Sequence, residues 1–137
     1  MSTTTFSGDW PMPEGLGRWE VEALHDAQIE RYGGSPGLRD AGLLESALAQ
    51  PVQELFGQLR YPTVPAQAAA YLYYLSRAHA FVDANKRTSL SCALVWLALH
   101  GLRLRLSHEE LFDLTLAVAQ GHLSLEETIE RFEQAAW

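Results

Sequence analysis

The sequence predicts an all-α fold, a single compact bundle of about six helices. Three observations support this prediction. The chain has 137 residues, of which 47% are hydrophobic, and this suits one domain with one core. Apolar residues recur at intervals of three and four along most of its length, which is the periodicity of amphipathic helices. The segments SHEE at 107–110 and SLEE at 124–127 each carry a glutamate three residues after a serine, a pattern typical of helix N-termini.

The first part of the chain divides into an arm and a helix. Residues 1–18 are rich in Thr, Ser, Gly and Pro, a composition that predicts a flexible N-terminal arm, so residues 19–137 are expected to form the domain. A helix should follow over residues 19–32 and stop at Gly33-Gly34. Its inward face is expected to carry Val21, Leu24, Ile29 and Tyr32.

A second, shorter helix is expected to begin after Asp40 as N-cap and to end before Pro51. Its buried residues are predicted to be Leu43, Leu44, Ala47 and Leu48. Residues 51–65 mix apolar side chains with a glycine and several prolines, so we expect a mobile excursion, of the kind that forms a flap, without regular structure.

The two central helices are predicted over residues 65–80 and 87–100. Pro65 suits the first turn of the former, and His79 continues its apolar stripe. The latter is apolar nearly all round, as expected for a helix enclosed by others, and Gly101 should cap it. The alternating LRLRL at 102–106 predicts a brief strand before the last two helices. Their inward residues should be Leu111, Leu114 and Val118, then Leu125, Ile129 and Phe132.

Charge and cysteine content narrow the possible partners. Ten basic residues stand against 17 acidic ones, and a net charge of -7 would repel both a phosphate backbone and an anionic membrane surface. We therefore expect no direct nucleic-acid partner and no membrane association. The lone cysteine, Cys92, lies in an apolar run and is expected to be buried in a reduced protein. With no long apolar stretch and no cationic leader, the expected location is the cytoplasm.

Five polar side chains gather between the two central helices, in the segment HAFVDANKR at residues 79–87. The first turn of the second helix exposes backbone N–H groups that favour an anion, and Lys86 and Arg87 add positive charge there. Lys86 is the only lysine in the chain. A single carboxylate such as Asp83, together with phosphate oxygens, suits Mg2+. His79 could accept a proton from a hydroxyl group.

Each of these residues also has an ordinary structural interpretation. A histidine on an apolar stripe is usually a core residue, and Asp83 with Asn85 could simply cap the second helix. The pair His79 and Asp83 could hold part of a transition-metal site, but the sequence offers no third ligand. Their combination in one short segment favours a phosphate-handling site. The remaining histidines are interpreted as surface or packing residues: His25, His100, His108 and His122.

The segment HAFVDANKR resembles the signature of the Fic/Doc family, specifically its death-on-curing (Doc-type) toxin branch. The similarity extends to HDAQIERYGGSPGLRDAGLLESAL at 25–48. It implies an all-α fold with a nucleotide-binding loop between the two central helices and a protein hydroxyl as acceptor. In this resemblance His79 is the general base and Asp83 the Mg2+ ligand. The residues that would bind the nucleotide are Ala84, Asn85, Lys86 and Arg87.

Three positions distinguish the branches of this family. The adenylylating branch has glycines around the loop asparagine and a second arginine, where this chain has Ala84, Lys86 and Leu90. The resemblance therefore implies the toxin branch, which transfers the γ-phosphate of ATP, typically to a threonine of elongation factor Tu. Ser91 stands where that branch carries an asparagine. The alternatives are AMP transfer and a catalytically inactive binding protein.

The same resemblance implies a type II toxin–antitoxin module in which the chain blocks translation. Many adenylylating relatives carry an inhibitory helix with Ser or Thr, then Glu four residues later, then Gly or Asn. This chain has no such string. Inhibition of the transferase is therefore expected from a separate antitoxin protein, whose disordered tail folds into a groove beside the loop.

Overall fold

The computed structural model describes residues 14–137, so residues 1–13 of the arm predicted over residues 1–18 lie outside the described residues. Over the described range the chain forms six helices and a small hairpin, so the all-α prediction is confirmed. The helices are α1 (Arg18–Tyr32), α2 (Ala41–Ala49), α3 (Val64–Ala78), α4 (Asn85–Leu99), α5 (His108–Ala119) and α6 (Leu125–Ala135). The two strands are β1 (Glu54–Leu55) and β2 (Gln58–Leu59).

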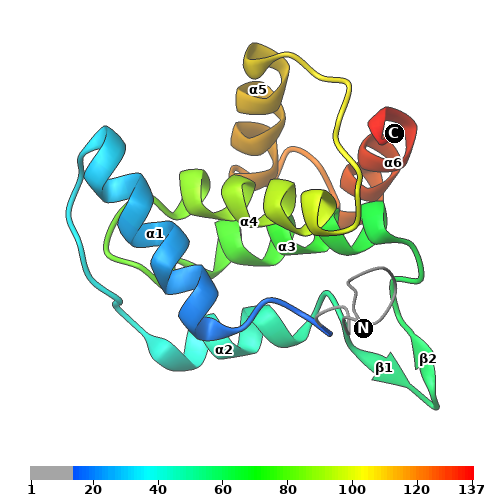
Figure 1. Cartoon of the computed structure of the whole chain (residues 1–137), viewed down its shortest axis with the longest axis horizontal. Coiled ribbons are helices and arrows are strands. Elements are labelled where there is room, and N and C mark those ends of the chain that lie inside the picture. Colours follow the sequence, from blue (N-terminus) through cyan, green and yellow to red (C-terminus); the bar gives the residue numbers. More distant parts are fainter. Residues whose placement is uncertain (1–13) are drawn as a thin grey trace, which may run out of the picture.

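Helices α3 and α4 lie side by side at the centre of the bundle (Figure 1). Helix α3 also packs against α2, α5 and α6, and α4 packs against α1 and α5. The largest fully buried side chains include Trp96, Tyr71 and Phe132, which come from three different helices. Cys92 is fully buried in α4 as predicted, and burial raises the pKa of its thiol to about 12. None of the helices within residues 14–137 is long and apolar enough to cross a membrane.

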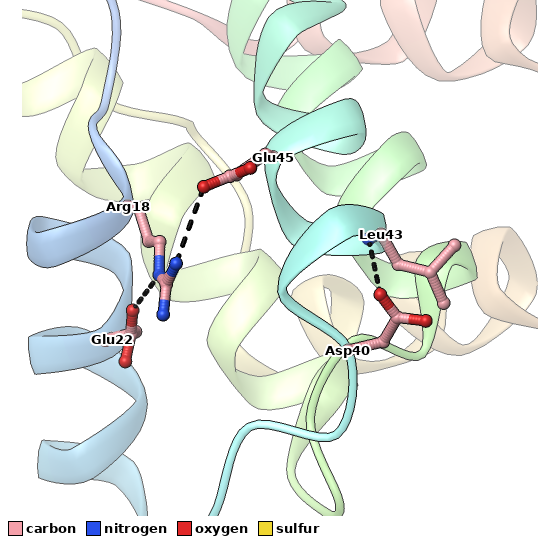
Figure 2. A network of polar contacts seen from close by, with 5 residues as sticks. All are labelled: Arg18, Glu22, Asp40, Leu43 and Glu45. Atoms are coloured by element: carbon pink, nitrogen blue, oxygen red, sulfur yellow. Dashed lines mark hydrogen bonds and ion pairs between the residues drawn. The ribbon is translucent and has the colours of Figure 1, made fainter.

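Several helix ends form where capping chemistry predicts. The Asp40 side chain accepts a hydrogen bond from the Leu43 amide at 3.0 Å (Figure 2). Ser107 and Ser124 both form complete capping boxes. Helix α1 ends at Tyr32, and the φ of its C-cap Gly33 is 84°, in the region that favours glycine. A partly buried Arg18 forms an ion pair with Glu22 within α1 and a second one with Glu45 of α2, also drawn in Figure 2.

The last residues of the predicted arm belong to the packed structure. Leu16 is only 7% exposed, and its amide donates a 2.8 Å hydrogen bond to the hydroxyl of Tyr71 on α3. A single leucine between two glycines has no periodicity, so the sequence pattern could not assign it to the core.

Two side chains predicted to face inward are exposed. Tyr32 at the end of α1 is 62% exposed, and Leu43 in the first turn of α2 is 39% exposed. The buried face of α1 instead carries Val21 and His25, one turn apart. The inward stripe of α1 is therefore narrower than the apolar pattern suggested, and it contains a polar residue.

The expectation of irregular structure over residues 51–65 is wrong. Strands β1 and β2 form an antiparallel hairpin there, with Glu54 opposite Leu59. Its two-residue turn has positive φ at both positions, 54° at Phe56 and 79° at Gly57, as hairpin turns that match strand twist require. A phenylalanine is an unusual residue in that conformation, which is why the turn was not predicted. The hairpin projects near the N-terminal end of α3, whereas the polar loop follows the C-terminal end (Figure 1).

The strand predicted at 102–106 is reduced to one isolated β-bridge. Leu104 pairs with Ala136, and backbone hydrogen bonds join Arg103 to Trp137 on one side of that pair. The partner segment, residues 136–137, follows α6 directly. The alternation of LRLRL therefore reflects partly buried leucines beside exposed arginines.

Candidate functional site

The polar loop connects α3 to α4 and is bounded by two residues in the left-handed conformation. His79 has φ 53° and ψ 42°, and Ala84 has φ 62° and ψ 27°. Neither residue is a glycine, so each conformation costs about 1–2 kcal/mol, which the surrounding contacts must offset. Helix α3 ends at Ala78 and α4 begins at Asn85, so the loop starts two residues earlier and ends two earlier than predicted. His79 therefore lies at a helix cap and not on the helical stripe.

The segment before α2 holds the first half of the loop. The amides of Arg39 and Asp40 donate to the Ala80 carbonyl at 2.7 and 3.0 Å, and the Val82 amide donates to Gly37 at 3.0 Å. The Arg39 guanidinium donates to the carbonyl of His79, with Nε at 2.8 Å. These bonds fix the backbone of His79 while its imidazole stays exposed. Sequence reasoning missed Arg39 because the contact spans 40 positions.

Asn85 closes the loop on itself. Its side-chain oxygen accepts from the Phe81 amide at 3.0 Å, and its side-chain nitrogen donates to the Phe81 carbonyl at 2.9 Å. The amide group that was predicted to cradle phosphate is therefore part of the framework of the loop. The backbone N–H of Asn85 can still bind an anion, because it lies in the first turn of α4, where the amides have no intrahelical acceptor.

The carboxylate of Asp83 is exposed and held by two backbone amides. Oδ2 accepts from Ser35 at 3.0 Å and Oδ1 accepts from Ala84 at 2.8 Å. These hydrogen bonds, the one from Ser35 first, lower the pKa of Asp83 below its ordinary value, and the positive charge of Arg87 lowers it further. The carboxylate is therefore ionised at neutral pH, the state that binds a cation.

The residues around Asp83 fit magnesium better than a metal that needs a protein cage. Between residues 14 and 137, no three His, Cys, Asp or Glu side chains come together as a metal-binding group. Mg2+ usually takes one or two carboxylates and fills its other positions with water and phosphate oxygens. Asp83 could hold Mg2+ in this way beside a bound nucleotide, whereas the part of the chain that the structure describes supplies no third ligand for the transition-metal alternative.

Arg87 is anchored to the C-terminal end of α1. Its guanidinium donates to the carbonyl of Gln28 at 3.3 Å and to that of Gly33 at 3.0 Å. Gly34 lies against both charged groups: a Cβ there would be 2.7 Å from Asp83 Oδ2 and 3.1 Å from Arg87 Nη2. The turn after α1 thus brings the two predicted binding residues together, and the adjacent Lys86 side chain stays exposed.

His25, predicted to be a surface or packing residue, is a buried neighbour of the loop. Only 1% of it is exposed, and its ring stacks on Phe81 while Nε2 lies 2.8 Å from the Asp83 carbonyl oxygen. The sequence signal was its position one turn after the apolar Val21. Phe81 is itself buried and anchors the loop to the hydrophobic core.

Two hollows extend from the loop along α4. One, of about 320 Å³, lies between α4 and α5, and the other, of about 300 Å³, lies between α4 and α1. Both are lined by Arg87, Leu90 and Leu94, and Lys86 borders the first. Ser91 lines the second hollow. The surface beside the loop is therefore cationic near Lys86 and Arg87 and apolar along Leu90 and Leu94.

A helical bundle whose two central helices are joined by a polar loop of this kind defines a known class, and the chain belongs to it. The Fic/DOC family model matches residues 16–97, from just before α1 to nearly the end of α4. The chain is similar to "Protein kinase doc" of Escherichia phage P1, 41% identical over 106 residues, which cover 77% of this chain and 82% of that protein. It is also similar to "Toxin Doc" of Mycolicibacterium smegmatis, 42% identical over 73 residues, which cover 53% and 56% of the two chains. The resemblance inferred from HAFVDANKR is thereby confirmed.

Proposed function

We propose that the chain is a Doc-type toxin that transfers the γ-phosphate of ATP to a serine or threonine hydroxyl of a protein. One observation carries the proposal. A single loop presents an exposed imidazole at His79, an ionised carboxylate at Asp83 and the first turn of α4. The name of the phage P1 relative, a protein kinase, supports the same reaction class.

In the proposed reaction His79 accepts the proton of the target hydroxyl as its oxygen bonds to the γ-phosphorus. The bond from that phosphorus to the β–γ bridging oxygen breaks, and ADP leaves with the electron pair. Mg2+, when bound, supplies positive charge that offsets the charge developing on the phosphate oxygens. Asp83 would hold this ion, while Lys86, Arg87 and the backbone amide of Asn85 would bind the phosphates. The amide of Ala84, which the sequence also assigned to the nucleotide, instead donates to the Asp83 carboxylate.

Lys86 and Leu90 support phosphate transfer over AMP transfer. Lys86 places an exposed ammonium at the start of α4, where a terminal phosphate can be held as by a point charge. Leu90 lines both hollows with apolar surface at the position where the adenylylating branch has its second arginine. AMP transfer by the same base is the alternative reaction, and the group found on the modified target distinguishes the two. If no product forms, the remaining alternative is a catalytically inactive binding protein.

The two hollows along α4 support an antitoxin as partner. An amphipathic segment could place apolar side chains on Leu90 and Leu94 and acidic ones beside Lys86 and Arg87. We propose that an antitoxin tail folds into this surface and restrains the toxin until it is released. The proposed target, elongation factor Tu, would place the action in the cytoplasm and at translation.

Intact-mass spectrometry of the target tests the proposal. Purified elongation factor Tu is incubated with the chain, ATP and Mg2+, and with the His79→Ala variant as control. The expected result is a gain of one phosphate, about 80 Da, with the wild type alone. A gain that matches AMP would replace the kinase assignment with AMP transfer. The same incubation can be repeated with a cell extract in place of the purified target. If no translation protein in the extract is modified, the enzyme assignment itself is contradicted.

A further inference from the structure

A buried histidine connects α1 to the site loop. Nε2 of His25 lies 2.8 Å from the backbone oxygen of Asp83. Because a carbonyl oxygen only accepts hydrogen bonds, Nε2 must carry the proton and donate. The ring of His25 stacks on Phe81 with 3.9 Å between centroids and an angle of 8° between planes. The His25 side chain thus contacts the loop at two residues, Phe81 and Asp83, and Asp83 carries the carboxylate of the site.

Core packing alone does not account for a histidine at this position. His25 is 1% exposed, and burying a polar ring is unfavourable unless it is hydrogen-bonded. An apolar side chain of similar size would fill the space and stack on Phe81 equally well. What the histidine adds over such an apolar side chain is an N–H for the Asp83 carbonyl, which belongs to a loop and has no helical donor.

The C-terminal half of α1 and the turn after it also hold the functional side chains of Asp83 and Arg87. The Ser35 amide, in the turn after α1, binds the Asp83 carboxylate at 3.0 Å. The Gln28 carbonyl in the last turns of α1 accepts from Arg87 at 3.3 Å. The Gly33 carbonyl accepts from Arg87 as well. With His25 on the Asp83 backbone, four links run from this part of the chain to the two residues assigned to cation and phosphate. Only the link from His25 comes from a fully buried side chain.

We propose that His25 is a positioning residue for the transfer reaction. Its hydrogen bond fixes the backbone of Asp83, so that the carboxylate keeps one orientation before the nucleotide binds. His25 contacts neither hydroxyl nor phosphate and acts only through Asp83. The expected effect of His25 on phosphate transfer rests on the proposed function. Its effect on the order of the loop does not, because that order can be measured without nucleotide.

Two substitutions separate the hydrogen bond from the stacking. His25→Phe keeps a flat ring against Phe81 and removes the donor. His25→Gln loses the ring and offers an amide N–H at similar reach from the backbone. Val21→Ala is the matched control, because Val21 is fully buried one turn earlier on the same face and its side chain cannot donate a hydrogen bond.

Three measurements on each full-length variant test the proposal: amide hydrogen exchange of residues 80–88 without nucleotide, the thermal midpoint, and kcat with the KM for ATP. His25→Phe is expected to speed loop exchange about 5- to 10-fold, the equivalent of one hydrogen bond. Its kcat should fall about 10- to 100-fold with little change in KM, since a slightly misplaced group is costly to catalysis. His25→Gln should restore both, and Val21→Ala should lower only the thermal midpoint.

Two results would overturn the proposal. Unchanged loop exchange and kcat in His25→Phe would show that the hydrogen bond does not order the site. Equal losses in both His25 variants, with faster exchange over the whole chain, would make His25 a core residue and nothing more. If the wild type transfers no phosphate, the proposed function fails separately, and the nucleotide-free exchange of the two variants still decides what His25 does to the loop.

Discussion

Replacing Gly34 with alanine should damage the site through a single added methyl group. The φ of Gly34 is 119°, a conformation that side chains rarely adopt, and the new Cβ would lie 2.7 Å from Asp83 Oδ2. The backbone conformation alone costs about 1–3 kcal/mol. The carboxylate must also shift, which weakens its bond to Ser35. We expect a loss of about 2–4 kcal/mol in the free energy of unfolding and a fall in kcat of about 10- to 100-fold.

Gly101→Ala is the matched control for this experiment. Gly101 also has positive φ, 75°, but a Cβ there meets nothing within 4 Å, and it lies at the far end of α4. This variant should lose about 1 kcal/mol and keep its transfer activity. Chemical denaturation and steady-state phosphate transfer measure the two effects. Full activity in Gly34→Ala, or equal losses of activity in both variants, would refute the reasoning from close approach.

Three further predictions concern the loop and the core. His79→Ala should fold and bind ATP normally but lose transfer by about 10²- to 10⁴-fold, as measured by product formation and calorimetric ATP titration. Because hydrogen bonds lower the pKa of Asp83, its ionised form stabilises the fold above the ordinary pKa of about 4, and this contribution disappears as the pH falls through the lowered value. Asp83→Asn should therefore flatten the acid side of a plot of unfolding free energy against pH, and an unaltered plot would contradict the assigned hydrogen bonds. The same variant should also abolish the response of activity to added Mg2+. The Cys92 thiol, with its pKa raised to about 12 by burial, should react with a thiol reagent only after unfolding, and rapid labelling of the native protein would contradict its placement.

Features that depend on neighbouring residues could be predicted from the sequence. The capping boxes at Ser107 and Ser124 and the stop at Gly33 use contacts within four residues, so local pattern determines them. The nine residues 79–87, which form the site loop and the first turn of α4, are contiguous, so their composition was visible before the fold was known. The roles of His79 and Asp83 remain proposals that rest on this composition and on the geometry of the loop.

Features that depend on distant contacts could not be predicted. Ser35 binds Asp83 across 48 positions and His25 binds it across 58. His25 stands one turn after the apolar Val21, a spacing that indicates burial but not which residue it contacts, and nothing in the sequence marks the contact of Ser35. The double hydrogen bond between Asn85 and Phe81 spans only four positions, yet the sequence did not show that the Asn85 side chain belongs to the framework of the loop. Side-chain orientation, and not residue type, decides such cases.

Parallel labelling with two forms of ATP tests the central claim most directly. The chain is incubated with elongation factor Tu and Mg2+ and with ATP labelled at either the α- or the γ-phosphate. If His79 directs the target hydroxyl to the γ-phosphorus, label should enter the protein only from γ-labelled ATP, ADP should accumulate, and His79→Ala should abolish both. Incorporation from α-labelled ATP, or incorporation that survives in His79→Ala, would contradict the account.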